Sequence, residues 1–288
     1  MILFIQEIIN GVLLGALLAL MSVGLSMVFG IMKTANFAYG ALYMLGGYVA
    51  YWSVALLQFP FLLALLAAFV VMFCIGMVVE TVGFGPFRDN EDATLIFGLG
   101  LAMLVRGAAI LAWGSQNRQI PSLGHGAISL GPFLFPPDRL YAGVAAIFIF
   151  IVMYFVIVRT RWGRTIRAVA DNAVRAGLLG INAAWQYRIV FGLGTGLAAV
   201  ASVMLIPVFG LAPTVDDSAM YTGFGVVILG GLGSIAGCAL GGMIIGIVTV
   251  FAFAYTDGVL APVFPLIVLF LVLVVKPDGI FGSRRRVA

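Results

Sequence analysis

The sequence predicts an all-α integral membrane protein with about eight or nine transmembrane helices, some of them broken or half-length. Hydrophobic residues make up 63% of the chain and charged residues only 9%, whereas an average soluble domain has about 25% charged residues. The apolar residues are gathered in runs long enough to cross the hydrocarbon core of a bilayer. We therefore expect one transmembrane domain over residues 1–288, with lipid as its surroundings.

Eight apolar runs are long enough for a helix that spans a membrane and satisfies all of its own backbone groups. They lie at 8–31, 37–57, 61–80, 94–113, 140–158, 187–209, 236–255 and 260–275. A ninth run, 219–230, is too short for a straight crossing. It ends in a stretch that contains Gly230, Gly231, Gly233 and Ser234. This pattern predicts a half-helix that is joined to the next helix by an irregular break.

The basic residues predict the orientation, because Lys and Arg are enriched beside the cytoplasmic ends of spanning helices. Nine crossings with an external N-terminus place four basic regions on the cytoplasmic side: Lys33, Arg88, the segment 159–188 and the C-terminal tail with Arg284 to Arg286. Eight crossings would put that tail on the side opposite the arginine-rich segment. We therefore expect nine membrane crossings.

The outer side is predicted to hold the acidic positions Glu7, Asp138, Asp216, Asp217 and Asp257. The stretch 114–139 is expected to be an outer loop, because its prolines and glycines oppose a continuous helix. His125, the single histidine, lies in this loop without cysteines or carboxylates at metal-ligand spacing. We therefore expect neither a metal site nor a cofactor.

Several classes of function are disfavoured by what the sequence lacks. No catalytic constellation and no G-x-x-x-x-G-K-[ST] phosphate loop is present, so another chain would have to bind any ATP. Glu80 and Arg106 are the charges near or within the spans, and a structural role is preferred for both because no central acid accompanies them. A secondary transporter, or a membrane enzyme or scaffold, stays an alternative. Nucleic acid is not expected as a partner, since the basic residues mark helix ends.

The segment 159–186 alternates arginines with apolar residues at near-helical spacing. Ile166, Val169 and Ala173 can share one face, which predicts an amphipathic cytoplasmic helix. Such a helix can lie on anionic lipid or dock onto a partner protein.

Three stretches together resemble the LivH-like permeases of branched-chain amino acid ABC importers. The first is Asn36-Phe-Ala-Tyr-Gly40, preceded by Gly24 to Gly30 and followed by Tyr43 to Val49. The second is Gly163-Arg-Thr-Ile-Arg-Ala-Val-Ala, with Ala176 to Asn182 after it. The third combines Leu229 to Gly237 with the closing Lys276-Pro-Asp-Gly-Ile-Phe-Gly282. The resemblance covers nearly the whole chain in the same order.

This resemblance implies a permease subunit that imports aliphatic amino acids delivered by an external solute-binding protein. It also implies a second, related permease and two cytoplasmic ATPases, so the chain itself is not expected to be an enzyme. Urea, an amide or another small solute is an alternative cargo. Tyr39 stands where the family usually has histidine, and Asp171-Asn172 and Ala183 to Gln186 depart from the more acidic family pattern.

Two sets of site residues follow. The translocation pathway is predicted to be shaped in its inner part by Asn36, Phe37, Tyr39 and Gly40, and a simple interfacial turn is the alternative explanation of these residues. Contact with an ATPase is predicted for Gly163, Arg164, Arg167, Ala168, Arg175, Gly180, Ile181 and Asn182.

Overall fold

The computed structural model describes residues 2–33, 36–88, 90–119, 128–130, 133–258 and 260–282. Its α-helices are α1 (Ile2–Met32), α2 (Tyr39–Ala55), α3 (Phe61–Val79), α4 (Glu91–Trp113), α5 (Pro137–Arg159), α6 (Arg161–Asp171), α7 (Ala173–Leu178), α8 (Ala183–Phe209), α9 (Val215–Gly230), α10 (Ile235–Tyr255) and α11 (Val263–Val275). A π-helical turn η1 (Glu80–Phe84) and a 3-10 turn η2 (Gly85–Phe87) continue α3. His125 and Arg284 to Arg286 lie outside the described residues.

The all-α membrane fold is confirmed. Six helices are long and apolar enough to cross a membrane: α1, α3 with its extension, α4, α5, α8 and α10. Three shorter apolar helices, α2, α9 and α11, have 17, 16 and 13 residues. Each of the nine predicted runs therefore corresponds to one helix in the described part of the chain.

Some predicted boundaries are wrong. Helix α9 begins at Val215 rather than at residue 219, so Asp216 and Asp217 lie in its first turn and not in an outer loop. Helix α8 begins at Ala183, because the Asn182 side chain accepts a hydrogen bond from the Trp185 N–H and caps the helix. The last four residues of the predicted coupling segment 159–186 thus belong to α8.

The predicted outer loop contains more structure than its composition indicated. Its end, from Pro137 onward, is the first turn of α5, where proline is favoured because its missing N–H needs no partner there. A short antiparallel hairpin, β1 (Ile128–Leu130) and β2 (Phe133–Phe135), precedes that helix.

The prediction of one amphipathic helix in the coupling segment is also wrong, because two short helices occupy it. Thr160 caps α6 through the Gly163 N–H, and Asn172 caps α7 through the Arg175 N–H. A side-chain cap of this kind starts a new helix and interrupts the preceding one. Ile166 and Val169 form the buried face of α6, while Ala173 belongs to α7.

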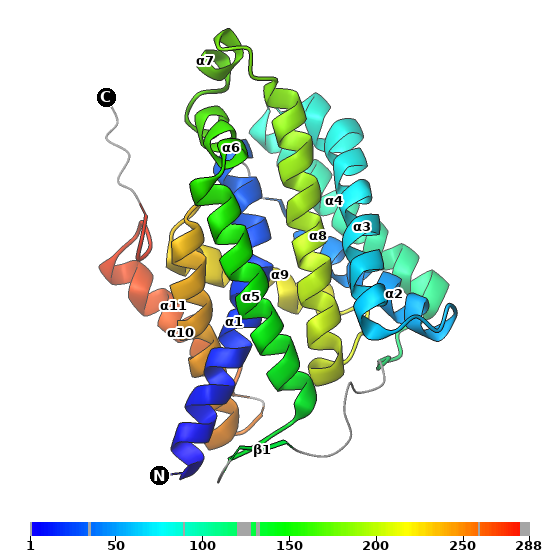
Figure 1. Cartoon of the computed structure of the whole chain (residues 1–288), viewed down its shortest axis with the longest axis vertical. Coiled ribbons are helices and arrows are strands. Elements are labelled where there is room, and N and C mark those ends of the chain that lie inside the picture. Colours follow the sequence, from blue (N-terminus) through cyan, green and yellow to red (C-terminus); the bar gives the residue numbers. More distant parts are fainter. Residues whose placement is uncertain are drawn as a thin grey trace.

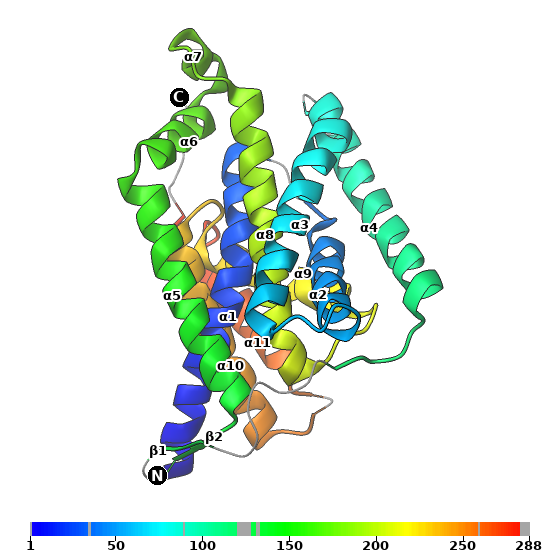
Figure 2. The same cartoon turned by 45° about the vertical axis from the view of Figure 1, so that its right-hand side comes forward.

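Helix α1 lies at the centre of the bundle, flanked by α5, α8 and α10 (Figures 1 and 2). Its most extensive contact is with α10, and small residues make this contact possible. A methyl group at Gly242 would lie 2.7 Å from both the Gly15 carbonyl oxygen and the Ala19 nitrogen. Such close approach is how helices associate in lipid, where packing replaces the hydrophobic driving force.

Helix α2 begins deep inside the bundle. The Tyr39 hydroxyl donates to the carbonyl of Met21, which lies eleven residues before the end of α1 at Met32, or about 16 Å of helix. The chain therefore turns back into the protein before α2 starts. There it meets the first turn of α9. Gly40 lies so close to this turn that a side chain at position 40 would collide with the Asp216 carbonyl.

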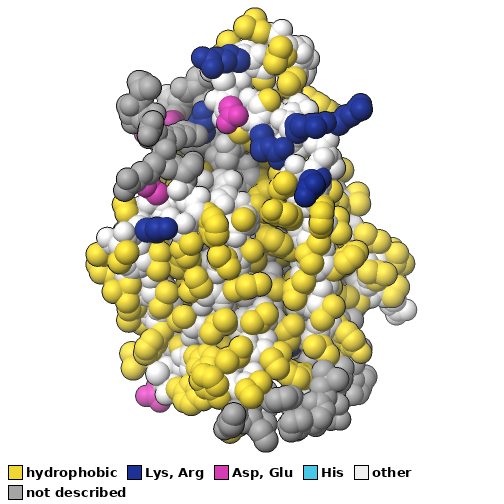
Figure 3. All heavy atoms as spheres, turned by 60° about the vertical axis from the view of Figure 1, so that its left-hand side comes forward, with side chains coloured by type: hydrophobic (Ala, Val, Ile, Leu, Met, Phe, Trp, Pro, Cys, Tyr) yellow, Lys and Arg dark blue, Asp and Glu magenta, His cyan; other side chains and the backbone are white. Residues whose placement is uncertain are grey.

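The two ends of the bundle differ in charge. The N-terminus and the hairpin lie at one end, and α6 and α7 lie at the other (Figures 1 and 2). Figure 3 shows apolar side chains over the middle of one face and most Lys and Arg side chains toward the α7 end. This distribution agrees with the predicted orientation, in which the α7 end faces the cytoplasm.

Candidate functional site

The predicted pathway segment at residues 36–40 is packed inside the protein. Asn36 is 2% exposed, and its Oδ1 accepts a 3.0 Å hydrogen bond from the Ala38 N–H. The Phe37 ring stacks on Phe224 of α9 at a centroid distance of 5.4 Å. Tyr39 is completely buried, with its hydroxyl bonded to α1.

This segment therefore holds α1, α2 and α9 together in the observed conformation. The described part of the chain has cavities of about 630 and 340 Å³, and neither is lined by Asn36, Phe37, Tyr39 or Gly40. Their role in shaping a pathway stays a prediction. Tyr43 of α2, one turn further along the helix, does line the larger of these cavities.

An apolar cavity of about 630 Å³ lies between α1, α9, α10, α11 and the end of α8. Five positions on one face of α9 contribute to its wall: Val215, Ser218, Ala219, Thr222 and Gly225. Other parts of the wall come from leucines of α1 and from Pro262, Pro265, Leu266 and Leu269 at and near α11. No charged side chain lines it among the described residues, so it suits an aliphatic group.

A charged cluster lies beside this cavity. Arg106 of α4 binds both carboxylate oxygens of Asp216, each at 2.6 Å, and also pairs with Asp217. Asp216 is 4% exposed. The expectation that no acid accompanies Arg106 is therefore wrong. The sequence did carry a signal, since two acids directly before an apolar run are typical of a helix N-terminus, where the helix dipole favours them.

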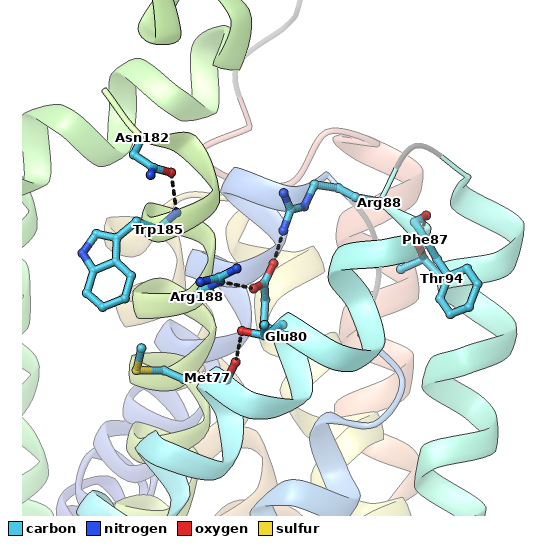
Figure 4. A network of polar contacts seen from close by, with 9 residues as sticks. Met77, Glu80, Phe87, Arg88, Thr94, Asn182, Trp185 and Arg188 are labelled. Carbon is cyan, nitrogen blue, oxygen red and sulfur yellow. Dashed lines mark hydrogen bonds and ion pairs between the residues drawn. The ribbon is translucent and has the colours of Figure 1, made fainter. Parts of the chain in front are cut away.

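A second charged cluster lies toward the α7 end (Figure 4). Glu80, at the start of η1, is fully buried and pairs with Arg88 and, at 3.8 Å, with Arg188 of α8. The Arg88 guanidinium also lies over the Tyr187 ring, 4.1 Å from its centroid. Glu80 thus connects the end of α3 to the start of α8, directly after the coupling segment.

The predicted coupling residues divide into inward-facing and outward-facing groups. Gly163 is buried against the end of α5, where a side chain would collide with the Ile157 carbonyl. Arg167 donates to the carbonyls of Ile157 and Val158, so it caps α5. Ala168 and Ile181 are half-buried, while Arg164, Arg175 and Gly180 are exposed.

The segment also presents an apolar tip that the sequence analysis missed. Val174, Leu178 and Leu179 are 78%, 84% and 80% exposed at the far end of the molecule. Exposed apolar side chains beyond the apolar belt, next to Arg175, are typical of a protein contact. The signal in the sequence was the adjacent leucine pair between Gly177 and Gly180.

The predicted helix break is present between α9 and α10. Gly231 and Gly233 have φ values of 104° and 81°, and the Ser234 hydroxyl caps α10 through the Gly237 N–H. Gly230 packs against Gly237 of α10. The closing segment completes the break, because the Ile280 and Phe281 N–H groups donate to the last carbonyls of α9 at 2.9 Å.

Comparison with known proteins gives close relatives over nearly the full length. Residues 7–275 match the family model for the permease component of the branched-chain amino acid transport system. The chain is 33% identical to the high-affinity branched-chain amino acid transport system permease protein BraD of Pseudomonas aeruginosa, over 97% of this chain and 96% of that protein. The corresponding LivH proteins of Escherichia coli and Salmonella typhimurium are 33% and 32% identical over the same shares. No solved structure matches the chain.

Proposed function

The chain belongs to the branched-chain amino acid transport permease family, and from this premise we propose that it forms the membrane pathway for aliphatic amino acids in an ATP-driven importer. It is a multi-pass protein of the inner membrane and works with ATPase subunits and a solute-binding protein, as its family implies. ATP hydrolysis belongs to those partner subunits. A second, related permease is proposed as the other half of the membrane part.

The observation that carries the proposed cargo is the near full-length similarity to permeases whose names state branched-chain amino acids. The apolar cavity supports it. Burying an aliphatic side chain there is favourable by about 0.8 kcal/mol for each CH₂ group removed from water. The two charged ends of the amino acid need polar groups instead. Ser218, Thr222 and Thr249 line the same cavity and supply hydroxyl groups without a fixed charge.

The contacts of the coupling segment indicate how ATPase movement would reach the pathway. Arg167 fixes α6 to the end of α5, and Asn182 and Arg188 fix the following residues to α8 and Glu80. A push on the exposed tip of α7 would therefore move α5 and α8 together. Both helices pack against α1, which lines the apolar cavity.

Uptake measurements test this function. The chain is expressed with its partner subunits and solute-binding protein in cells that lack their own branched-chain amino acid importers. Leucine uptake is expected, with isoleucine and valine as competitors, and it should stop when the ATPase subunits carry a disabled phosphate loop. Uptake of urea or an amide without leucine uptake would contradict the proposal. Leucine uptake that persists without ATP hydrolysis and follows an ion gradient would indicate a secondary transporter.

A further inference from the structure

A second cavity, of about 340 Å³, lies at the end of the bundle opposite α6 and α7. Charged and amide side chains from two helices line it: Glu7 and Asn10 of α1, and Arg139 of α5. The apolar cavity, by contrast, has no charged residue in its described lining. Here one carboxylate and one guanidinium share a cavity of the size that small ligands occupy.

Helix packing places these three residues at the same depth. Gly143 of α5 packs on Leu13 of α1, where a methyl group would lie 2.8 Å from Leu13 Cβ. Both helices run in the same direction (Figure 1). Arg139 precedes Gly143 by about one turn, and Asn10 precedes Leu13 by about one turn. Arg139 of α5 thus lies at the same level along the bundle as Asn10 of α1, across the cavity.

The polar groups of this cavity are not fully satisfied by one another. Asn10 is 8% exposed, and its Nδ2 donates a long hydrogen bond, 3.4 Å, to Glu7 Oε2. Its Oδ1 has no hydrogen-bond partner among the described residues. No ion pair joins Glu7 to Arg139 in the described part of the chain. A carboxylate and a guanidinium that line one cavity without pairing are available to a ligand with both charges.

The rest of the wall is mainly apolar, with one hydroxyl group from Thr249, and leads onward. Leu13, Leu14, Leu17, Leu205 and Val208 surround the polar groups. Five residues line both cavities, so the two spaces adjoin: Leu14, Leu205, Phe209, Thr249 and Phe253. A ligand with charged ends at Glu7 and Arg139 would thus have its side chain directed along α1 leucines toward the apolar cavity.

We propose that this outer cavity is the entry site for the amino-acid zwitterion. The Glu7 carboxylate binds the ammonium group, the Arg139 guanidinium binds the carboxylate, and the leucines of α1 contact the aliphatic side chain. The proposal rests on the proposed import function. Its location opposite the coupling segment is the external side, where a solute-binding protein releases its cargo.

Equilibrium binding of radiolabelled leucine to the purified assembled transporter, without its solute-binding protein, tests the site. Glu7→Gln and Arg139→Gln should each weaken leucine binding about tenfold, the effect of losing one charged hydrogen bond. Isocaproate lacks the ammonium group and isopentylamine lacks the carboxylate. Competition by isocaproate should be unchanged in Glu7→Gln, and competition by isopentylamine should be unchanged in Arg139→Gln. Asp257→Asn, which removes an exposed charge outside the cavity lining, serves as the control.

The outcomes separate this site from the import function. Wild-type leucine affinity in both variants would overturn the site, as would a variant that weakens both analogues equally, since that pattern indicates only altered packing. A wild-type transporter that imports leucine but binds none without its solute-binding protein would overturn it too. A transporter that neither binds nor imports leucine would instead contradict the proposed function.

Discussion

Gly15 and Gly242 show how much a missing side chain decides in this protein. They lie where α1 and α10 cross, and the backbone of one helix occupies the space that a side chain of the other would need. In lipid, such contacts replace the hydrophobic effect as the cause of helix association. Gly100 and Gly107 of α4 have no such role, because there is open space where a methyl group would be.

This contrast between Gly242 and Gly100 gives a matched test. Gly242→Ala should destabilise the protein by about 1 to 3 kcal/mol, the usual effect of overfilling a packed contact. Gly100→Ala makes the same chemical change in a helix with open space and should be neutral or slightly stabilising. Thermal unfolding of the two purified variants, followed by size-exclusion chromatography, measures the difference. Equal stability of the two variants would show that α1 and α10 can move apart at their crossing without a loss of stability.

The buried charges illustrate a second effect at this scale. Glu80 and Asp216 are each almost completely removed from solvent, and each has arginine partners. Breaking a buried ion pair by removing one partner leaves an uncompensated charge, which costs about 3 to 5 kcal/mol. The two clusters join helices that are distant in sequence, α3 to α8 and α4 to α9. Both clusters thus connect helices, which agrees with the structural role that the sequence analysis preferred for Glu80 and Arg106.

At the scale of elements, the segment between α5 and α8 combines a fixed base with a projecting tip. Helix α6 is held to α5 by Arg167, and its Ile166 and Val169 are buried in the protein. Helix α7 projects from it, and Gly180 reverses the chain with φ of 80°, a conformation that other residues adopt only with strain. An exposed apolar tip on a firmly attached base suits the transmission of movement.

The tip itself can be tested. Replacing both Leu178 and Leu179 with serine should reduce leucine uptake at least about tenfold, because apolar anchors at the centre of an interface commonly contribute about 2 kcal/mol or more. The amount of membrane-inserted protein should not change, since both side chains are exposed. Replacing both with methionine, which keeps apolar area, is the control. Uptake is normalised to assembled complex, and normal uptake by the serine variant would exclude the tip as an ATPase contact.

For the whole molecule, the arrangement of the helices agrees with an orientation that the basic residues alone predict. The coupling segment lies at the end opposite the N-terminus and the hairpin (Figure 2). The half-length helices α2 and α9 both begin inside the bundle, where Gly40 meets Asp216. Broken helices of this kind bring backbone ends to the middle of a membrane protein, where polar parts of a substrate can use them.

Labelling of single cysteines tests the orientation. In a chain with Cys74 and Cys238 replaced by alanine, Asp257→Cys should react with a membrane-impermeant maleimide on intact cells. Ala173→Cys should react only after the membrane is opened, because α7 faces the cytoplasm in this orientation. Both positions are at least partly accessible to solvent in the structure. Labelling of Ala173→Cys from outside would reverse the orientation and remove the basis for an external entry site at Glu7.

The amino-acid sequence alone predicts the membrane class, the approximate positions of nine apolar helices and the family. These properties depend on local features, namely the length of each apolar run, the basic residues beside it and short motifs such as Gly163 to Ala170. The glycine-rich break after Gly230 was also predictable from the sequence. The chain adopts positive φ values there, and glycine is the residue that adopts them without strain. Helix caps were harder to predict. Periodicity alone indicated one helix in the coupling segment, but the caps at Thr160 and Asn172 divide it into two.

Which distant residues meet depends on how the helices pack, and this is known only from the folded structure. Arg106 and Asp216 are separated by 110 positions, and no local pattern predicts that they form a pair. The same holds for the two cavities, whose walls combine residues of α1 with the ends of α8 and α10. Periodicity indicates which face of a helix is apolar, but in lipid nearly every face is apolar. The choice of partner therefore depends on close packing between particular surfaces, which exists only once the helices have assembled.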